Sequence, residues 1–407
     1  MKTVPVATSQ AHQHWGLLTA LFTTASLLEI VLFSNLSAFT PLFLQGIGYD
    51  DAGVKTWTGI LASAGIALGF WFVPFWGVLA DRHGRKLLIL RSFAVEAIAV
   101  MLMAFSNNVW VFLFGRMLTG LALGNTGLMF ATLADQAPRE RVGLAISLVT
   151  GSQPVGGVVG SLLGGFIVSR FGVHTLFAVD AVLIGLVTLM LWIFFRETFV
   201  PGPVYPLGRM LRTALGAVAK TPIVLALFAF SFFMQSAFFF SNPFVPNRIV
   251  EMLQGADPGA TIGLVIGIAG IATLFTTPAW GFAADRFGHR RLLPLVTALT
   301  AILYLPLYWA ADLVGFTLGL FFLNAAGPAV NSLTFAIIGL ETPRERRGAV
   351  MSMIYMPLNA AILIAPSLAI LLTTEIRQVF VWSSGLAFFG FILLLALTRT
   401  RAAAAKG

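Results

Sequence analysis

The sequence predicts an all-α membrane protein with twelve transmembrane helices in two six-helix bundles related by a parallel internal repeat. Three observations lead to this prediction: an unusually apolar composition, twelve apolar stretches of span length, and a motif that occurs once in each half. The 407 residues are 58% hydrophobic and only 10% charged, with a mean hydropathy of +0.91. An ordinary soluble domain carries about 25% charged residues, so a soluble core does not fit this composition.

Twelve apolar stretches have the length of a membrane span. A bilayer core of about 30 Å takes roughly 20 apolar residues per helix, and a helix satisfies its own backbone hydrogen bonds there. The longest hydrophilic stretch contains three prolines and predicts a cytoplasmic linker at 197–220, between an N-terminal bundle at 1–196 and a C-terminal bundle at 221–407. The apolar stretches lie at 16–40, 56–80, 87–105, 109–134, 142–168, 173–195, 221–246, 258–284, 292–311, 313–340, 348–374 and 378–398.

Lysine and arginine are distributed unequally between the two sides of the membrane. With the N-terminus placed inside, 20 of the 25 positive residues lie in cytoplasmic segments and 4 on the opposite side. This bias predicts that both termini are cytoplasmic. The first apolar stretch follows no small-residue cleavage site, so it is interpreted as an uncleaved span. Because the net charge of +9 lies in short loops, we expect membrane lipids and not nucleic acid as partners.

Two motifs recur along the chain at nearly the same offset. One closes the second and eighth stretches at positions 204 residues apart, and a Pro-Arg-Glu-Arg sequence ending at Arg141 recurs 205 residues later, ending at Arg346. Two motifs at one offset indicate duplication of a six-helix unit. Since six is even, both copies enter the membrane in the same direction. The first motif consists of Gly77, Asp81, Arg82, Gly84, Arg85 and Lys86, and its second copy of Gly281, Asp285, Arg286, Gly288 and Arg290.

Several kinds of chemistry find no support in the sequence. There is no cysteine, and the five histidines lack metal-ligand spacing. No phosphate-binding loop and no catalytic constellation is present. We therefore expect no metal, no cofactor and no enzymatic activity.

The repeated motif resembles the signature of the major facilitator superfamily. Its first copy reads G-x-L-A-D-R-x-G-R-K-x-L from Gly77 to Leu88, and the resemblance extends over essentially the whole chain. Arg116-Met-Leu-Thr-Gly120 is similar to the buried-arginine motif of drug:proton antiporters. A glycine run in the fifth stretch resembles their antiporter motif, with Ser161 where that family has proline; it comprises Gly156, Gly160, Gly164 and Gly165. The resemblance implies a monomeric bacterial inner-membrane transporter of small molecules and protons.

Four ionisable residues lie inside the predicted spans, all in the first half: Glu29, Glu96, Arg116 and Asp180. A charge at the bilayer centre costs roughly 2.5–3.5 kcal/mol, so each is expected to face a cavity or a partner. Glu29 and Arg116 both lie about 20 Å from the cytoplasmic side, which makes them the favoured proton-coupling pair. Glu96 and Asp180 are weaker candidates. For all four, a structural hydrogen bond or a tie to backbone carbonyls is the alternative.

Resemblance and pseudo-symmetry also imply a gate and a cavity. Asp81 is expected near Arg346, and Asp285 near Arg141, closing the cytoplasmic side; alternatively these loops only orient the protein. The glycine run suits close helix packing. Polar and aromatic residues of the seventh and tenth stretches are expected to line a substrate cavity, unless most of the Phe side chains face lipid; they are Phe232, Gln235, Phe239, Asn324 and Asn331.

These observations together favour a proton-coupled secondary transporter that exports lipophilic drugs or similar small molecules by alternating access. One alternative is a proton-coupled importer or facilitator of sugars or other metabolites. Another, of a different class, is a membrane sensor that binds ligand without transporting it. Flux under an imposed pH gradient distinguishes the three.

Overall fold

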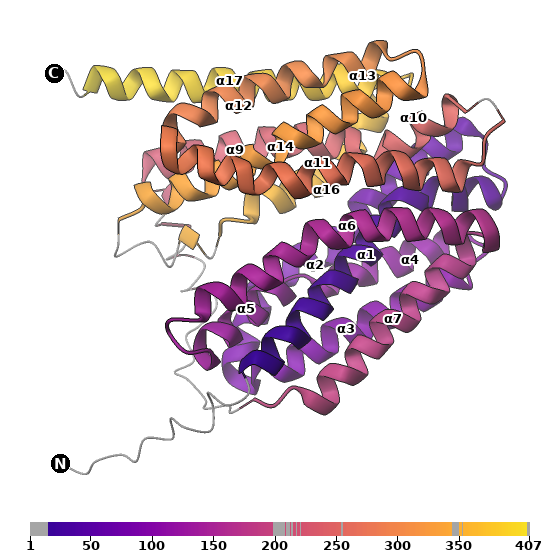
Figure 1. Cartoon of the computed structure of the whole chain (residues 1–407), viewed down its shortest axis with the longest axis horizontal. Coiled ribbons are helices and arrows are strands. Elements are labelled where there is room, and N and C mark those ends of the chain that lie inside the picture. The colour runs from indigo at the N-terminus through magenta and orange to yellow at the C-terminus, as the bar shows by residue number, and fades with distance from the viewer. Residues whose placement is uncertain are drawn as a thin grey trace.

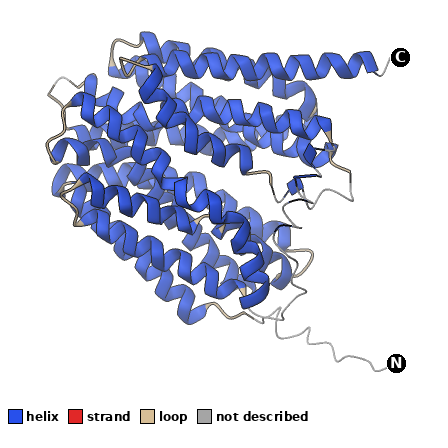
Figure 2. Ribbon diagram, turned by 180° about the vertical axis from the view of Figure 1, so that it is seen from behind, coloured by secondary structure: helices blue, strands red, loops and turns tan. Residues whose placement is uncertain are grey.

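The computed structural model describes residues 15–197, 221–253, 255–343, 350–351 and 353–404, with isolated positions between 208 and 219. Side chains at 73–75, 77–78, 81 and 397–404 lie outside this description. Within the described residues every regular element is an α-helix or a short 3-10 helix (Figure 2).

The helices up to residue 194 lie together in one group, coloured indigo to magenta in Figure 1. Two of these helices have an N-cap side chain. Asp50 accepts a hydrogen bond from the N–H of Gly53 at 2.9 Å, and Asn108 accepts one from the N–H of Trp110 at 2.8 Å. Such caps satisfy N–H groups that the first helical turn leaves unpaired. The elements are α1 (Trp15–Gly46), α2 (Asp51–His83), α3 (Arg85–Ala104), α4 (Val109–Thr119), η2 (Gly120–Ala122), α5 (Asn125–Gln136), α6 (Val142–Phe171) and α7 (Val173–Phe194).

The helices from residue 222 form a second group, coloured pink to yellow (Figure 1). Asp257 and Asp312 cap two of them, accepting the N–H of Ala260 and of Gly315 at 2.7 Å each. The elements are α9 (Pro222–Ser241), η3 (Asn242–Phe244), α10 (Val245–Glu251), α11 (Pro258–Phe287), α12 (His289–Leu303), α13 (Leu305–Trp309), α14 (Leu313–Glu341), α16 (Met356–Leu372) and α17 (Gln378–Ala404).

Ten described helical segments are long and apolar enough to cross a membrane. Three of them contain a break that the apolar pattern does not reveal: 109–136, 222–251 and 289–309. In the first, Gly124 has a φ of 94°, a conformation that favours glycine, so α5 starts in a new direction. In the others, Pro243 and Pro306 follow the break, because proline lacks the N–H that would continue the helix.

The two groups meet along two helix pairs, α6 with α11 and α2 with α16. A Cβ added at Gly165 of α6 would lie 2.9 Å from the Cα of Gly263 on α11, so only glycines allow this approach. On the other pair, Ser367 of α16 donates to Ser63 of α2 at 2.9 Å. The groups approach each other near α10 and diverge toward the end that carries both termini (Figure 1).

Candidate transport site

Two carboxylic acids are buried in the first group, one on α1 and one on α3. Glu29 on α1 is 7% exposed, and Glu96 on α3 is fully buried. The charge of Glu29 acts on Glu96, and neither carboxyl oxygen of Glu96 has a hydrogen-bond partner. The amide of Asn125, the first residue of α5, lies beside Glu29. The sequence favours Arg116 over Glu96 as the partner of Glu29, whereas the structure brings Glu96 within electrostatic range of it.

Arg116 on α4 is held by the backbone of α2. Its Nε donates to the carbonyl oxygen of Leu61 at 3.3 Å, and its Nη1 is buried without a partner. The guanidinium fills the space over Gly65, where an added Cβ would lie 2.9 Å from Nη2. None of the described ion pairs joins Arg116 to Glu29. In this conformation Arg116 ties α4 to α2, and its pairing with Glu29 stays a prediction.

Asp180 on α7 is bonded to α1. The Nδ2 of Asn35 donates to both carboxylate oxygens, at 3.0 and 3.1 Å, and Asp180 is only 1% exposed. An amide that donates to both oxygens partly compensates a buried carboxyl. Asp180 therefore has the cross-helix hydrogen bond that Glu96 lacks.

Three glycines of α6 allow α1 to pack closely against it. A Cβ at Gly156 would lie 2.6 Å from the carbonyl oxygen of Leu27, and one at Gly160 would lie 2.9 Å from that of Val31. Gly164 faces α1 in the same way, one turn further along. The run predicted to serve close helix packing thus lies against the helix that carries Glu29.

Ser161 adds a polar contact to this interface. Its hydroxyl lies 2.8 Å from the hydroxyl of Ser34 on α1, and it donates to the carbonyl oxygen of Gly157 at 2.9 Å. Proline at this position could make neither bond. The departure from the antiporter pattern is therefore accommodated by a hydrogen bond between α6 and α1.

A cavity of about 270 Å³ lies in the second group, between α9, α12, α14 and α16. Its lining contains aromatic, aliphatic, amide and hydroxyl side chains, but no Asp, Glu, Lys, Arg or His. Such a surface suits a small lipophilic ligand that is oriented by a few hydrogen bonds. Phe232 lies outside the lining and packs edge-on against Phe233, at 5.5 Å between ring centroids. The four other predicted cavity residues line it: Gln235, Phe239, Asn324 and Asn331.

The repeated motif forms the turn between α2 and α3. Gly84 has a φ of 89°, and its counterpart Gly288 a φ of 88°, a conformation that favours glycine. The backbone N–H groups of Arg85 and Lys86 donate to the two carboxylate oxygens of Glu197, both at 2.8 Å. Sequence reasoning missed Glu197, whose only signal is an acidic residue directly after the sixth stretch.

Each group has an ion pair at equivalent places. Arg85, at the start of α3, pairs with Asp135 near the end of α5 at 2.5 Å. Arg290, near the start of α12, pairs with Glu341 at the end of α14. Both pairs join helices of the same group, so they brace each group separately.

The remaining gate residues make no described contact between the groups. Gly77 and Asp81 lie in α2 without described side chains, and Arg346 lies outside the described residues. No ion pair joins Asp285 to Arg141 among the described pairs. Both predicted closing contacts therefore stay predictions. The exposed motif residues are Arg82, Arg141, Gly281, Asp285, Arg286, Gly288 and Arg290.

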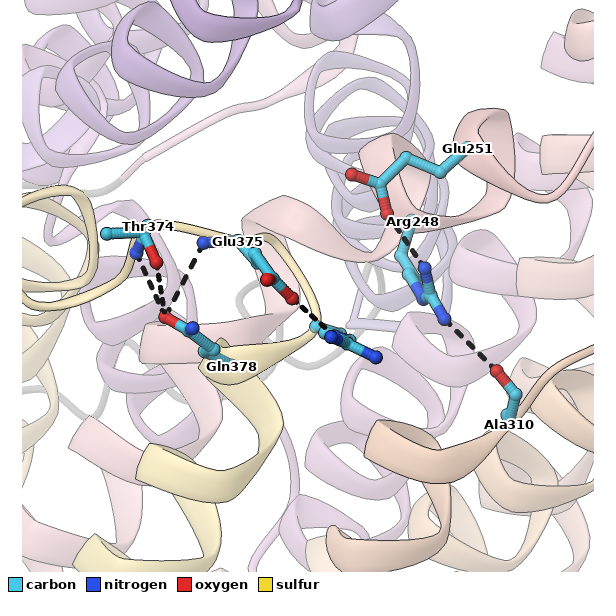
Figure 3. A network of polar contacts seen from close by, with 7 residues as sticks. Arg248, Glu251, Ala310, Thr374, Glu375 and Gln378 are labelled. Carbon is cyan, nitrogen blue, oxygen red and sulfur yellow. Dashed lines mark hydrogen bonds and ion pairs between the residues drawn. The ribbon is translucent and has the colours of Figure 1, made fainter.

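At the opposite end of α2, the two groups are joined by Lys55, whose Nζ donates to the carbonyl oxygen of Thr373 after α16. Nearby, Arg248 of α10 pairs with Glu251 at 2.9 Å and donates to the carbonyl oxygen of Ala310 at 3.0 Å (Figure 3). The contact from Lys55 to Thr373 thus joins the two groups near the end where they approach each other.

The loop before α17 lies in the same region (Figure 3). Arg377 donates from Nε to Glu375 at 2.5 Å, and Gln378 accepts the N–H of Thr374 at 2.9 Å. The hydrogen bond that Arg377 donates to Glu375, reinforced by the negative charge of that carboxylate, raises the pKa of Arg377. This guanidinium therefore stays charged.

The family model of the Major Facilitator Superfamily matches residues 21–256 and 251–407. The chain belongs to the major facilitator superfamily. This facilitator is 29% identical over 342 residues to the multi-drug resistance efflux pump PmrA homolog of Lactococcus lactis subsp. lactis (strain IL1403), with 82% of each chain covered. It is 32% identical over 278 residues to the multidrug resistance protein MdtG of Rahnella sp. (strain Y9602), covering 68% of this chain and 67% of the relative.

Solved structures of transporters share the fold of this chain. The POT family transporter PepTSo superposes with a TM-score of 0.76 at 15% identity, over 94% of this chain and 98% of that one. The nucleoside transporter NupG gives a TM-score of 0.73 at 15% identity, over 94% and 99%. The facilitator is therefore an integral membrane protein of a transporter family, not an enzyme, with multidrug efflux pumps among its relatives.

Proposed function

We propose that this protein exports lipophilic small molecules, such as drugs, in exchange for protons by alternating access. The observation that carries the proposal is a separation of tasks between the two helix groups. The carboxyl groups buried at mid-span, Glu29, Glu96 and Asp180, all belong to the first group. The uncharged cavity belongs to the second. Proton binding and substrate binding therefore have separate sites in one molecule.

The chemistry of each site fits its task. A carboxyl in the apolar core gains or loses its charge according to its access to water and its neighbours, which makes it a proton carrier. The cavity offers aromatic surface and amide groups to an apolar ligand. Relatives that are named multidrug efflux pumps and resistance proteins support drugs as the substrate class.

For the topology, the proposal includes twelve transmembrane helices in two bundles, at 1–196 and 221–407, joined by the linker 197–220. The equivalent ion pairs of Arg85 and Arg290 support the repeat. The bias of lysine and arginine supports cytoplasmic termini, in a bacterial inner membrane. We expect the transporter to act as a monomer.

The proposal also takes this conformation as the one that opens toward the cytoplasm in this topology. The contacts that join the groups, from Lys55 to Thr373 and from Ser63 to Ser367, lie on helices whose cytoplasmic ends diverge. The predicted pair of Asp285 and Arg141 is not among the ion pairs of the described residues. It belongs to the opposite state, in which the cytoplasmic side is closed.

The test is an efflux profile of a drug-sensitive bacterial strain that expresses this chain. We expect raised tolerance to lipophilic drugs and lower accumulation of a lipophilic dye, both abolished when an uncoupler collapses the proton gradient. Accumulation of the dye or of a sugar under the same gradient would indicate an importer. Binding without any flux would indicate a sensor. Dye export that persists without a proton gradient would contradict the coupling.

A further inference from the structure

The cavity of the second group presents unused amide groups from two helices. Gln235 lies on α9 and Asn331 on α14, and both line the cavity. Within the part of the chain that the structure describes, neither side chain makes a hydrogen bond. Each amide therefore offers an acceptor oxygen and two N–H donors to a ligand.

Most other polar groups of the lining are already engaged. The hydroxyls of Thr300 and Thr334 donate to carbonyl oxygens one turn earlier in their own helices, at 2.8 and 2.6 Å. The Nδ2 of Asn324 does the same at 2.9 Å. Gln235 and Asn331 are thus the lining side chains with the largest unused capacity for hydrogen bonds.

Charged side chains lie far from this cavity. Of the four helices that line it, α9 and α16 contain no Asp, Glu, Lys, Arg or His. On the other two, such residues occur only in the first turn of α12, up to Arg291, and at the last residue of α14, Glu341. Roughly 10 Å or more of helix separates Arg291 from Thr300 and Glu341 from Thr334. A charged ligand would therefore lose its water without gaining a counter-charge.

The size and the aromatic surface of the cavity limit the shape of its ligand. An apolar cavity of about 150 Å³ holds one benzene molecule. The volume here is about 270 Å³, which suits two fused rings with a small substituent. Phe238 and Phe239 both line the cavity, with their rings edge-on at 5.0 Å between centroids. Aromatic ligands pack well against such rings, in stacked or edge-to-face arrangements.

We propose that the cavity binds neutral two-ring aromatic molecules that carry a carboxamide-like group, which exchanges hydrogen bonds with Gln235 and Asn331. The inference deepens the proposed function and rests on it for the role of the cavity in transport. A carboxamide both donates and accepts, so it can pair with either side-chain amide. A charged analogue of the same size is expected to bind much more weakly.

The experiment measures the binding of four naphthalene probes to the purified full chain in lipid nanodiscs, at neutral pH. Empty nanodiscs give the partition of each probe into lipid. The probes share the two rings and differ in one substituent: naphthamide, isopropylnaphthalene, naphthoate and naphthyltrimethylammonium. We expect naphthamide to bind at least about 10-fold more tightly than either charged probe, because an ion without a partner is disfavoured in the cavity.

Substitutions of the two amides test their role. Gln235→Leu and Asn331→Leu should each weaken the binding of naphthamide about 2- to 10-fold, since each removes a hydrogen bond. Isopropylnaphthalene should bind to these variants at least as well as to the wild type, which shows that the cavity is intact. Ser332→Ala, at an exposed neighbour of Asn331 outside the lining, is the control and should leave all four affinities unchanged.

Equal affinity for naphthamide and for either charged probe would overturn the preference for neutral ligands. Unchanged binding of naphthamide in both Leu variants, or an equal loss of isopropylnaphthalene, would overturn the role of the two amides. Where a Leu variant does not fold, the comparison of probes on the wild type still tests the proposal. Binding requires no proton gradient. The expected binding pattern without export would therefore refute the proposed function and support this inference, and export without that pattern would do the reverse.

Discussion

Glu197 stabilises the start of α3, because its two oxygens accept the first two N–H groups of that helix at 2.8 Å each. The turn before it needs Gly84 in a positive-φ conformation, and the side chain of Lys86 reaches back to the carbonyl oxygen of Trp192 at 3.0 Å. The signature motif is therefore held from the end of α7. This link does not depend on the other helix group.

Glu197→Gln should lower stability by about 1 kcal/mol, since the amide keeps one acceptor oxygen but loses the negative charge at the helix N-terminus. The measurement is the midpoint of thermal unfolding in detergent. Glu140→Gln, an exposed carboxylate of the loop before α6, is the control and should be neutral. Equal effects of the two substitutions would show that Glu197 does not cap α3.

Arg377→Gln should change the rate of transport but not the shape of its pH profile. The contact with Glu375 raises the pKa of Arg377. The stability that the charged arginine gains from this contact is therefore lost only as the pH rises through that raised pKa. From about pH 5 to 9 the guanidinium is constantly charged. Flux measured across this range should give parallel curves for the variant and the wild type. A shifted curve would place a pH-sensing group in this loop.

At the scale of helices, the two groups touch through glycine. A Cβ at Gly263 of α11 would lie 2.5 Å from the carbonyl oxygen of Ser161 and 2.8 Å from the Cα of Gly165, both on α6. Backbone atoms cannot yield as a flexible side chain can, so the helices must separate if a side chain is added. The close packing of Gly263 against α6 therefore favours the conformation in which these two helices touch.

Gly263→Ala should shift the population toward the state that is open at the end opposite the termini. Because the chain contains no cysteine, two cysteines can be introduced for spin labels at the ends of α6 and α11, and their distance distribution measured. We expect a longer distance in the variant. Gly151→Ala on α6, where nothing lies within 4 Å of an added Cβ, controls for the gain in helix propensity and should leave the distribution unchanged. Identical distributions for both variants would exclude the glycine contact as a gate.

Asn331→Leu should alter selectivity and not pH dependence, because the cavity it lines contains no charged side chain. Losing one hydrogen bond costs roughly 0.5–1.5 kcal/mol, so the apparent affinity for a substrate with polar groups should fall about 2- to 10-fold. A purely apolar substrate should be affected less. Phe232→Ala, outside the lining, serves as the comparison. A changed pH profile would mean that the cavity takes part in proton coupling.

The sequence predicts the helices better than their breaks and partners. Apolar stretches near 109–134 and 292–311 are confirmed as helical segments long and apolar enough to cross a membrane. Gly124 and the Leu305–Pro306 step interrupt them, and hydrophobicity predicts neither break. Depth along a helix favoured Arg116 as the partner of Glu29, and this pairing stays a prediction. Depth cannot decide it, because depth leaves the rotation of each helix undetermined. Contacts between helices decide that rotation.

At the scale of the whole molecule, the structure combines closure at one end with two separate kinds of site. The groups are joined by Lys55 and by the glycines of α6 and α11, while the buried carboxyl groups and the uncharged cavity occupy different groups. The proposed export requires that proton binding in one group and substrate binding in the other favour opposite states of the same interface. Under this proposal the coupling belongs to the interface and not to either site alone.

The most direct test of proton-driven export is substrate flux in proteoliposomes with an imposed pH gradient, comparing the wild type with Glu29→Gln. The amide keeps the shape of the side chain but cannot exchange a proton. We predict uphill movement of a lipophilic substrate by the wild type, and only downhill exchange by the variant. Uphill transport by Glu29→Gln at the wild-type rate, or wild-type flux that is insensitive to the gradient, would contradict the central claim.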